Sequence, residues 1–121
     1  GDEPPPREVL LIVDDDEDIR SMLAMTFRGR FEIFEAADGI EAFLMASAHR
    51  PDYVLLDYKL PRLDGRYAAE MIRDVAPEAL IVAFSGALTE KPEWADLFVR
   101  KSDADSVPSL RRALQALDRS Q

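Results

Sequence analysis

Four short apolar runs divide the chain, and each is followed by polar residues of a different kind. The runs span residues 9–13, 53–56, 80–84 and 97–99, and they lead in turn into Asp14-Asp15, Asp57, Ser85 and Arg100-Lys101. Short continuous apolar runs are typical of strands that are buried on both faces of a parallel sheet. Because the carboxyl ends of parallel strands meet at one edge, where open α/β sheets bind ligands, we expect these polar residues to form one site.

Helical patterns separate the apolar runs. Apolar residues at helical spacing fall at positions 19, 22, 23 and 27, at 42, 43 and 46, at 68, 71, 72 and 75, and at 110, 113, 114 and 117. Acidic residues at 16–18, Asp38 and Asp64 precede the first three patterns and are suited to helix N-termini. Residues 31–35 alternate only partly, which favours a short edge strand. The alternation of strands and helices predicts an α/β fold built of βα units around a parallel sheet. We also expect the four methionines, Met22, Met25, Met45 and Met71, to be buried or partly buried.

The connection between the last two apolar runs is unusually short. Only Gly86 to Asp96 is available, and Pro92 lies inside it. A parallel crossover normally needs about 10–12 residues or more, usually including a helix. We therefore predict that the fourth helix is short or missing. Trp94 either covers the gap that this leaves or forms an exposed anchor for a partner, and we favour the first.

Composition limits the classes of function. The chain of 121 residues has the length of one domain, contains no cysteine and carries a formal net charge of −9. The acidic balance argues against direct nucleic-acid binding, and no apolar run approaches the roughly 18 residues that span a bilayer. We expect a Pro-rich tail or linker over residues 1–6, one domain over residues 7–119, and a cytoplasmic location. The leading Gly1 suggests a piece of a longer protein or a remnant of expression.

The acidic residues are the candidates for chemistry. The run from Asp14 to Asp18 is by itself explained by an acidic first helical turn. Asp57, which follows a buried strand at the same edge, makes three converging carboxylates, a ligand set suited to Mg²⁺. A carboxylate beside Mg²⁺ can attack a phosphoryl group, and Asp57 is the candidate nucleophile. Lys101 would supply a positive charge and Ser85 a hydroxyl. Taken alone, each is more typical of an ordinary surface lysine or turn serine, and only the joint arrangement at four strand ends favours a site.

Taken together, these segments resemble the receiver domain of two-component response regulators over about residues 7–119. The matching segments are Val-Leu-Leu-Ile-Val-Asp-Asp-Asp-Glu-Asp-Ile-Arg (9–20), Ala-Asp-Gly-Ile-Glu-Ala (37–42) and Pro-Asp-Tyr-Val-Leu-Leu-Asp-Tyr-Lys-Leu-Pro-Arg-Leu-Asp-Gly (51–65), with Ser85 and Lys101. The resemblance implies a flavodoxin-like receiver fold, a three-layer, doubly wound α/β structure whose five-stranded parallel sheet has the order 2-1-3-4-5. It also implies phosphoryl transfer to Asp57 from a histidine kinase or a histidine phosphotransfer protein, and an output through a downstream protein or a fused domain.

The resemblance assigns roles to individual residues. Asp15, Asp57 and the backbone carbonyl of Lys59 would bind Mg²⁺ directly, and Asp14 would act mostly through water. Ser85 would donate a hydrogen bond to one phosphoryl oxygen, and Lys101 would pair with another. Phe98 occupies the position of the family's switch aromatic, while simple packing in the core explains it equally well.

The chain departs from the family in two places. Ser102 follows Lys101 where receivers usually have proline after a cis bond, and we predict a trans bond because a non-proline cis bond costs about 3–4 kcal/mol. The short 86–96 connection removes most of a helix that usually takes part in the response. We therefore expect the signal to emerge through this segment.

Two other functions compete with a signalling receiver, which would be no enzyme beyond slow autodephosphorylation. A degenerate receiver would bind partners without phosphorylation. A phosphatase of the haloacid dehalogenase type would also use an Asp nucleophile with Mg²⁺, but it needs a second Asp two positions later, where this chain has Lys59.

Overall fold

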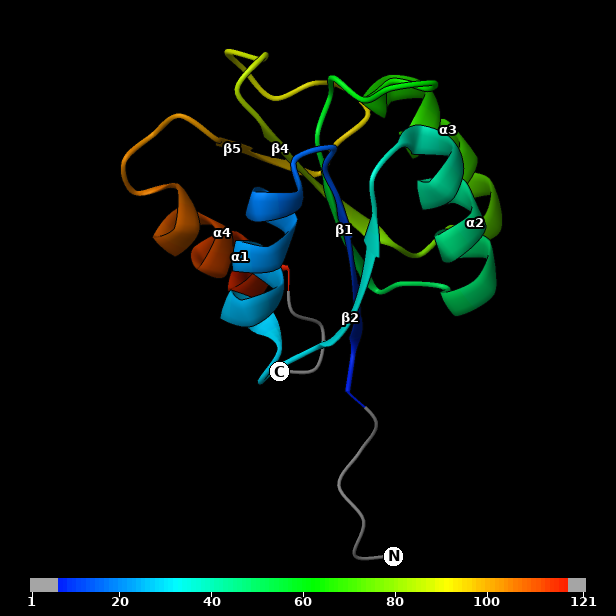
Figure 1. Ribbon diagram of the computed structural model, residues 1–121, viewed down its shortest axis with the longest axis horizontal. Helices are drawn as coiled ribbons and strands as arrows, with labels where there is room; N and C mark the ends of the chain where they lie inside the picture. The colour runs from blue at the N-terminus through cyan, green and yellow to red at the C-terminus, as the bar shows by residue number, and fades with distance from the viewer. Residues whose placement is uncertain (1–6, 118–121) are drawn as a thin grey trace, which may run out of the picture.

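A computed structural model describes residues 7–117, which form a three-layer α/β fold (Figure 1). The five parallel strands are β1 (Val9–Val13), β2 (Glu32–Ala36), β3 (Tyr53–Leu56), β4 (Leu80–Ser85) and β5 (Leu97–Arg100), in the order β2-β1-β3-β4-β5. The sheet order is the predicted one. The predicted segments 1–6 and 118–119 lie outside the described residues.

Four helices cover the sheet: α1 (Glu17–Phe27), α2 (Gly39–His49), α3 (Gly65–Val75) and α4 (Ser106–Ala116). Helices α1 and α4 lie on one face, and α2 and α3 lie on the other (Figure 1). Within residues 86–96 the described backbone forms turns and bends but no helix, so the prediction that the fourth helix is short or missing is confirmed. The label α4 therefore belongs to the last helix of the chain.

The strand period of two divides the core between the two faces. In β1, Leu10 and Ile12 belong to the cluster beneath α1 and α4, while Leu11 and Val13 belong to the cluster beneath α2 and α3. All four side chains are at most 2% exposed, as expected for a central strand. Burial on both faces fixes the register, because a slip of one residue would exchange the two sets of side chains.

Aspartate caps begin three of the helices, as predicted. Asp16, Asp38 and Asp64 each accept hydrogen bonds from backbone N–H groups in the first turn of α1, α2 and α3. At α3 the cap is followed by Gly65, where an added Cβ would lie 2.5 Å from the carbonyl oxygen of Asp57. Glycine is therefore needed there, because it lets the start of α3 approach the end of β3 closely.

The expectation for the methionines of α1 is wrong. Met22 is 40% exposed and Met25 is 73% exposed. The buried stripe of α1 instead consists of Leu23, Ala24 and Phe27, since the helix packs on one sheet face and buries only a narrow strip. Met45 and Met71 are half-buried, as expected.

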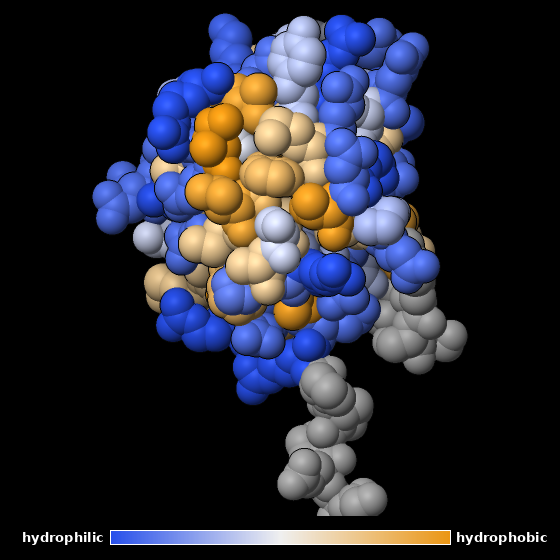
Figure 2. Space-filling model, turned by 90° about the vertical axis from the view of Figure 1, so that its right-hand side faces the viewer, coloured by the Kyte–Doolittle hydropathy of each residue, from blue (hydrophilic) through white to orange (hydrophobic). Residues whose placement is uncertain are grey.

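The side formed by α2 and α3 carries a group of hydrophobic residues at its surface (Figure 2). Among the exposed ones are Ile40 and Leu44 of α2. None of the described helices is long and apolar enough to cross a membrane.

Side chains from α3 and from the link itself hold the second half of the 86–96 segment in place. Arg73 Nη2 donates to the carbonyl oxygen of Trp94 at 2.9 Å and contacts Asp96 Oδ2 at 3.3 Å. Asp96 Oδ2 in turn accepts from the backbone N–H of Ile81 at 2.8 Å. Lys91 Nζ donates to the carbonyl oxygen of Ala95 at 3.0 Å. The bonds of Trp94 and Asp96 fasten the end of the link to α3 and β4, and the bond from Lys91 to Ala95 holds the link to itself.

Candidate functional site

Two buried carboxylates lie at the ends of the central strands. The backbone N–H of Asp14 donates to the carbonyl oxygen of Ala36 at 3.1 Å, and that of Asp57 donates to Val13 at 3.1 Å. The hydrogen-bonded ladder of the sheet thus continues into both residues and fixes their backbones. Asp14 is 2% exposed and Asp57 is 6% exposed, which is unusual for charged side chains.

Asp15 completes a group of three carboxylates. Asp14, Asp15 and Asp57 each offer an oxygen atom, and these three atoms lie within 4.8 Å of one another. Asp15 is exposed, so the group opens to solvent on one side. Three converging carboxylate oxygens beside solvent match the needs of Mg²⁺, which prefers hard oxygen ligands and retains several waters. The side chain of Lys59 is exposed in the loop after β3.

Lys101 bridges the two buried carboxylates. Its Nζ donates to Asp14 Oδ2 at 2.6 Å and to Asp57 Oδ2 at 2.9 Å. Burial by itself would lower the pKa of Lys101, but the hydrogen bonds and charges of Asp14 and Asp57 raise it overall. Burial raises the pKa of Asp14, although the hydrogen bond from Lys101 partly offsets this effect. The ammonium group therefore keeps two crowded carboxylates together at neutral pH.

Ser85 lies beside this group at the end of β4. It is fully buried, and its Oγ accepts a hydrogen bond from the backbone N–H of Ala87 at 3.1 Å. This turn orients the side chain and leaves its O–H free to donate. The carbonyl oxygen of Ser85 accepts from the backbone N–H of Lys101 at 3.2 Å, so the two side chains are carried by directly paired strand ends.

Phe98 lies on β5 three residues before Lys101, is paired with Ala83 of β4, and is half-buried. It packs with Leu88 and Trp94 against the core cluster on the α3 side of the sheet. Core packing therefore accounts for its position, and a switch role stays a prediction. The Lys101–Ser102 peptide bond is trans, as predicted.

The sequence analysis missed Arg20 of α1. Its Nη1 donates to the carbonyl oxygen of Asp14 at 2.7 Å, and its Nε lies 3.4 Å from Glu35 Oε1. These contacts fasten α1 to the ends of β1 and β2 next to the carboxylates. The only signal in the sequence is a cation two residues after the acidic run that ends at Asp18, which is too common a pattern to identify Arg20.

Comparisons with known proteins decide the family. The model of the response regulator receiver domain matches residues 10–116. The chain belongs to this family. Receiver domains are signalling domains of two-component systems, and the acidic group at the carboxyl edge of this one is its phosphoacceptor site.

Relatives of this receiver occur among mycobacterial regulators. It is 38% identical over 117 residues to the transcriptional regulatory protein PdtaR of Mycobacterium tuberculosis, covering 93% of this chain and 53% of PdtaR. It is 35% identical over 78 residues to the response regulator MprA of Mycobacterium avium, covering 63% of this chain and 34% of MprA. The chain thus spans about half of PdtaR and a third of MprA.

Solved structures share the fold. The response regulator TrrA of Thermotoga maritima, determined in complex with Mg²⁺ and a beryllium fluoride, is 27% identical with a TM-score of 0.79, covering 92% of this chain and 99% of TrrA. The chemotaxis protein CheY4 of Vibrio cholerae, at 24% identity, superposes with a TM-score of 0.80 over 93% of this chain and 99% of CheY4. Both comparisons support the receiver fold for this chain, despite its short β4–β5 connection.

Proposed function

We propose that this receiver accepts a phosphoryl group on Asp57 from the phosphohistidine of a kinase or phosphotransfer protein, in a Mg²⁺-dependent reaction. The observation that carries the proposal is the buried Asp57 carboxylate, held by Lys101 beside Asp14 and Asp15. The family and the phosphoryl-mimic complex of TrrA support it. The domain is the segment 7–119, acting in the cytoplasm on a downstream protein or a fused output domain.

The reaction uses one oxygen of Asp57 as the nucleophile. A carboxylate oxygen attacks the phosphorus atom, the bond between phosphorus and the imidazole nitrogen breaks, and the imidazole leaves as the neutral ring after taking up a proton. Lys101 already contacts Asp57 Oδ2, so its ammonium group lies where charge develops on the phosphoryl oxygens. Ser85 can donate its O–H to another of these oxygens, because Ala87 uses only a lone pair of its Oγ.

The three carboxylates and the backbone carbonyl of Lys59 are the ligands we assign to Mg²⁺. When bound, the ion neutralises charge on the phosphoryl oxygens and on the crowded carboxylates. Asp15 is the exposed member of the group and is the one that faces an entering ion. Asp14 shares Lys101 with Asp57 and acts mostly through water.

The signal leaves through the short link between β4 and β5. Phosphorylation draws Ser85 toward the phosphoryl group, and the adjoining residues 86–90 follow because few bonds hold them. The second half of the link is fastened by Arg73 and Lys91. Phe98, which packs against the same core cluster as Leu88 and Trp94, adjusts its rotamer with this movement.

Intact-mass measurement after incubation with Mg²⁺ and a small phosphodonor tests the proposal. The native chain should gain the mass of one phosphoryl group in a form stable to acid and labile to base, and Asp57→Asn should not. Asp74→Asn, a change of an exposed aspartate on α3, is the matched control and should behave like the native chain. No gain and no response to beryllofluoride would favour a degenerate receiver, whereas multiple turnover of phosphate esters would favour a phosphatase.

A further inference from the structure

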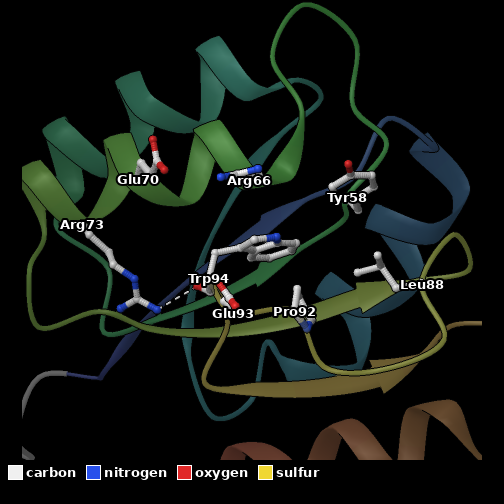
Figure 3. Close-up of a pocket in the computed structure, with 8 residues that line it drawn as sticks. All are labelled: Tyr58, Arg66, Glu70, Arg73, Leu88, Pro92, Glu93 and Trp94. Atoms are coloured by element: carbon white, nitrogen blue, oxygen red, sulfur yellow. Dashed lines mark hydrogen bonds between the residues drawn. The ribbon is translucent and has the colours of Figure 1, made fainter.

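A groove runs between α3 and the short β4–β5 link, at the place of the missing helix (Figure 3). It encloses about 530 Å³ and is lined by Tyr58, Arg66, Glu70, Arg73, Leu88, Pro92, Glu93 and Trp94. The helix α3 contributes charged side chains, and the link contributes apolar side chains together with Glu93 (Figure 3). The groove is separate from the carboxylates of the phosphoacceptor site.

Two aromatic rings form a platform in this groove. The rings of Tyr58 and Trp94 are nearly parallel, with an interplanar angle of 14° and centroids 6.2 Å apart. Leu88 and Pro92 extend the platform on the side of the link (Figure 3). Trp94 packs against the core and is half-buried, so it covers the gap as expected and still presents part of its surface to the groove.

Several polar side chains around the platform make no hydrogen bond or ion pair with the described residues. Arg73 is occupied by Trp94 and Asp96, but the side chains of Arg66, Glu70 and Glu93 make no hydrogen bond or ion pair with the residues that the structure describes. The indole N–H of Trp94 likewise has no acceptor among them. The groove therefore offers two kinds of donor, a guanidinium and an indole N–H, together with two carboxylates.

We propose that this groove binds a proline-rich segment of a partner protein that carries a basic residue next to its prolines. A polyproline II segment has no internal hydrogen bonds, so its carbonyl oxygens are free to accept from Arg66 and Trp94. Its proline rings pack on parallel aromatic side chains, as in other aromatic-lined grooves. The basic side chain pairs with Glu70 and Glu93. The binding surface exists because the fourth helix is missing.

The charge of the protein favours a partner over a second copy of this chain. The chain has its own Pro4-Pro5-Pro6-Arg7 sequence, but acidic residues flank it and each copy carries a formal net charge of −9. Two such molecules repel each other, whereas a basic segment is attracted to the acidic surface. The proposal concerns the unmodified protein, so its failure would leave the phosphoacceptor proposal intact.

Fluorescence titration tests the proposal, because Trp94 is the only tryptophan in the chain. The probe is the capped peptide Ala-Pro-Pro-Pro-Arg-Ala, which has no fluorescent side chain. We expect a saturable change in Trp94 emission below about 1 mM peptide, in the weak range for a short segment. A peptide in which alanine replaces the three prolines should bind at least about fivefold more weakly, since it must first be ordered into the extended conformation.

Three variants test the polar contacts. The double variant Glu70→Gln with Glu93→Gln should weaken binding of the arginine peptide by about three- to fivefold, as expected for exposed ion pairs. Arg66→Met should weaken it by a similar factor, because methionine has no N–H group to donate. Glu90→Gln, an exposed residue of the same link that does not line the groove, is the matched control and should bind like the native chain.

Each other outcome overturns the proposal. The proposal is excluded if Trp94 emission shows no saturable change with the arginine peptide. It is also excluded if the alanine peptide binds with the same affinity, or if the double variant binds the arginine peptide as the native chain does. Tighter binding of a synthetic peptide Asp-Glu-Pro-Pro-Pro-Arg, together with dimers in sedimentation equilibrium, would replace the partner with a second copy of the chain.

Discussion

The connections that follow β3 and β4 lie on the same face of the sheet and are built differently. After β3, the helix α3 buries Ala68, Ala69 and Ile72 completely. After β4, the 86–96 link has only Ala95 buried, and Leu88 and Trp94 are half-buried. Yet both connections join strand ends that carry groups of the same site. The phosphoacceptor chemistry of a receiver thus depends on where the strands end. The surface that changes on phosphorylation depends on the segments that connect the strands.

The largest expected effect contrasts the packing of these two connections. Ile72→Ala should lower the free energy of unfolding by about 3 kcal/mol, because it leaves a cavity beneath α3. Leu88→Ala should cost about 1 kcal/mol, since this side chain is only half-buried in the link. Urea denaturation of both variants measures the difference. Equal losses would show that the link is packed as firmly as the helix.

The anchor of the link gives a smaller effect. Arg73→Met keeps much of the aliphatic stem but removes the hydrogen bonds to Trp94 and Asp96. It should lower the free energy of unfolding by about 1–2 kcal/mol, because one acceptor is charged and the guanidinium is partly exposed. Arg112→Met is the control. Arg112 is exposed and pairs with the exposed Asp105 and the half-buried Ser109, so its loss should cost less than about 0.5 kcal/mol. If the urea midpoint of Arg73→Met equals that of the native chain, Arg73 does not stabilise the link.

The smallest expected effect on stability comes from Asp14, at the end of β1. Because burial raises the pKa of Asp14, ionisation of this group is less favourable in the folded chain than in the unfolded one. Asp14→Asn should therefore stabilise the protein at pH 7, by roughly 0.5–1 kcal/mol. The advantage should disappear as the pH falls below the ordinary pKa of 3.8, where Asp14 is protonated in both states of the native chain.

Denaturation at several pH values measures this effect. A variant that is less stable at pH 7 would mean that the bonds of Asp14 to Lys101 and Asp16 outweigh its burial.

Local patterns were enough to predict the elements and the edge where the site lies. The apolar runs, the aspartate caps and the short 86–96 segment each depend on neighbouring residues. The structure confirms the strands, helix starts and short connection that they predict. The stripe of α1 was misjudged at Met22 and Met25 because helical spacing alone allows several neighbouring stripes.

The convergence of Asp14, Asp15 and Asp57 follows from the strand ends, but individual side-chain bonds between distant residues could not be predicted. Lys101 was expected beside a phosphoryl group, but its bonds to Asp14 and Asp57 join residues 87 and 44 positions away. The ion pair between Arg73 and Asp96 joins residues 23 positions apart. Whether the charged side chains of the groove find partners likewise depends on the packed fold. Long side chains have many possible partners, and only the packed fold selects among them.

The most direct test compares amide chemical shifts with and without Mg²⁺ and beryllofluoride. The account predicts large changes at residues 57–59, 84–90 and 100–102, with small changes at residues 91–96, where Arg73 and Lys91 hold the link. Unchanged shifts over residues 86–101 would contradict the claim that an ordinary phosphoacceptor site reports through the short β4–β5 connection.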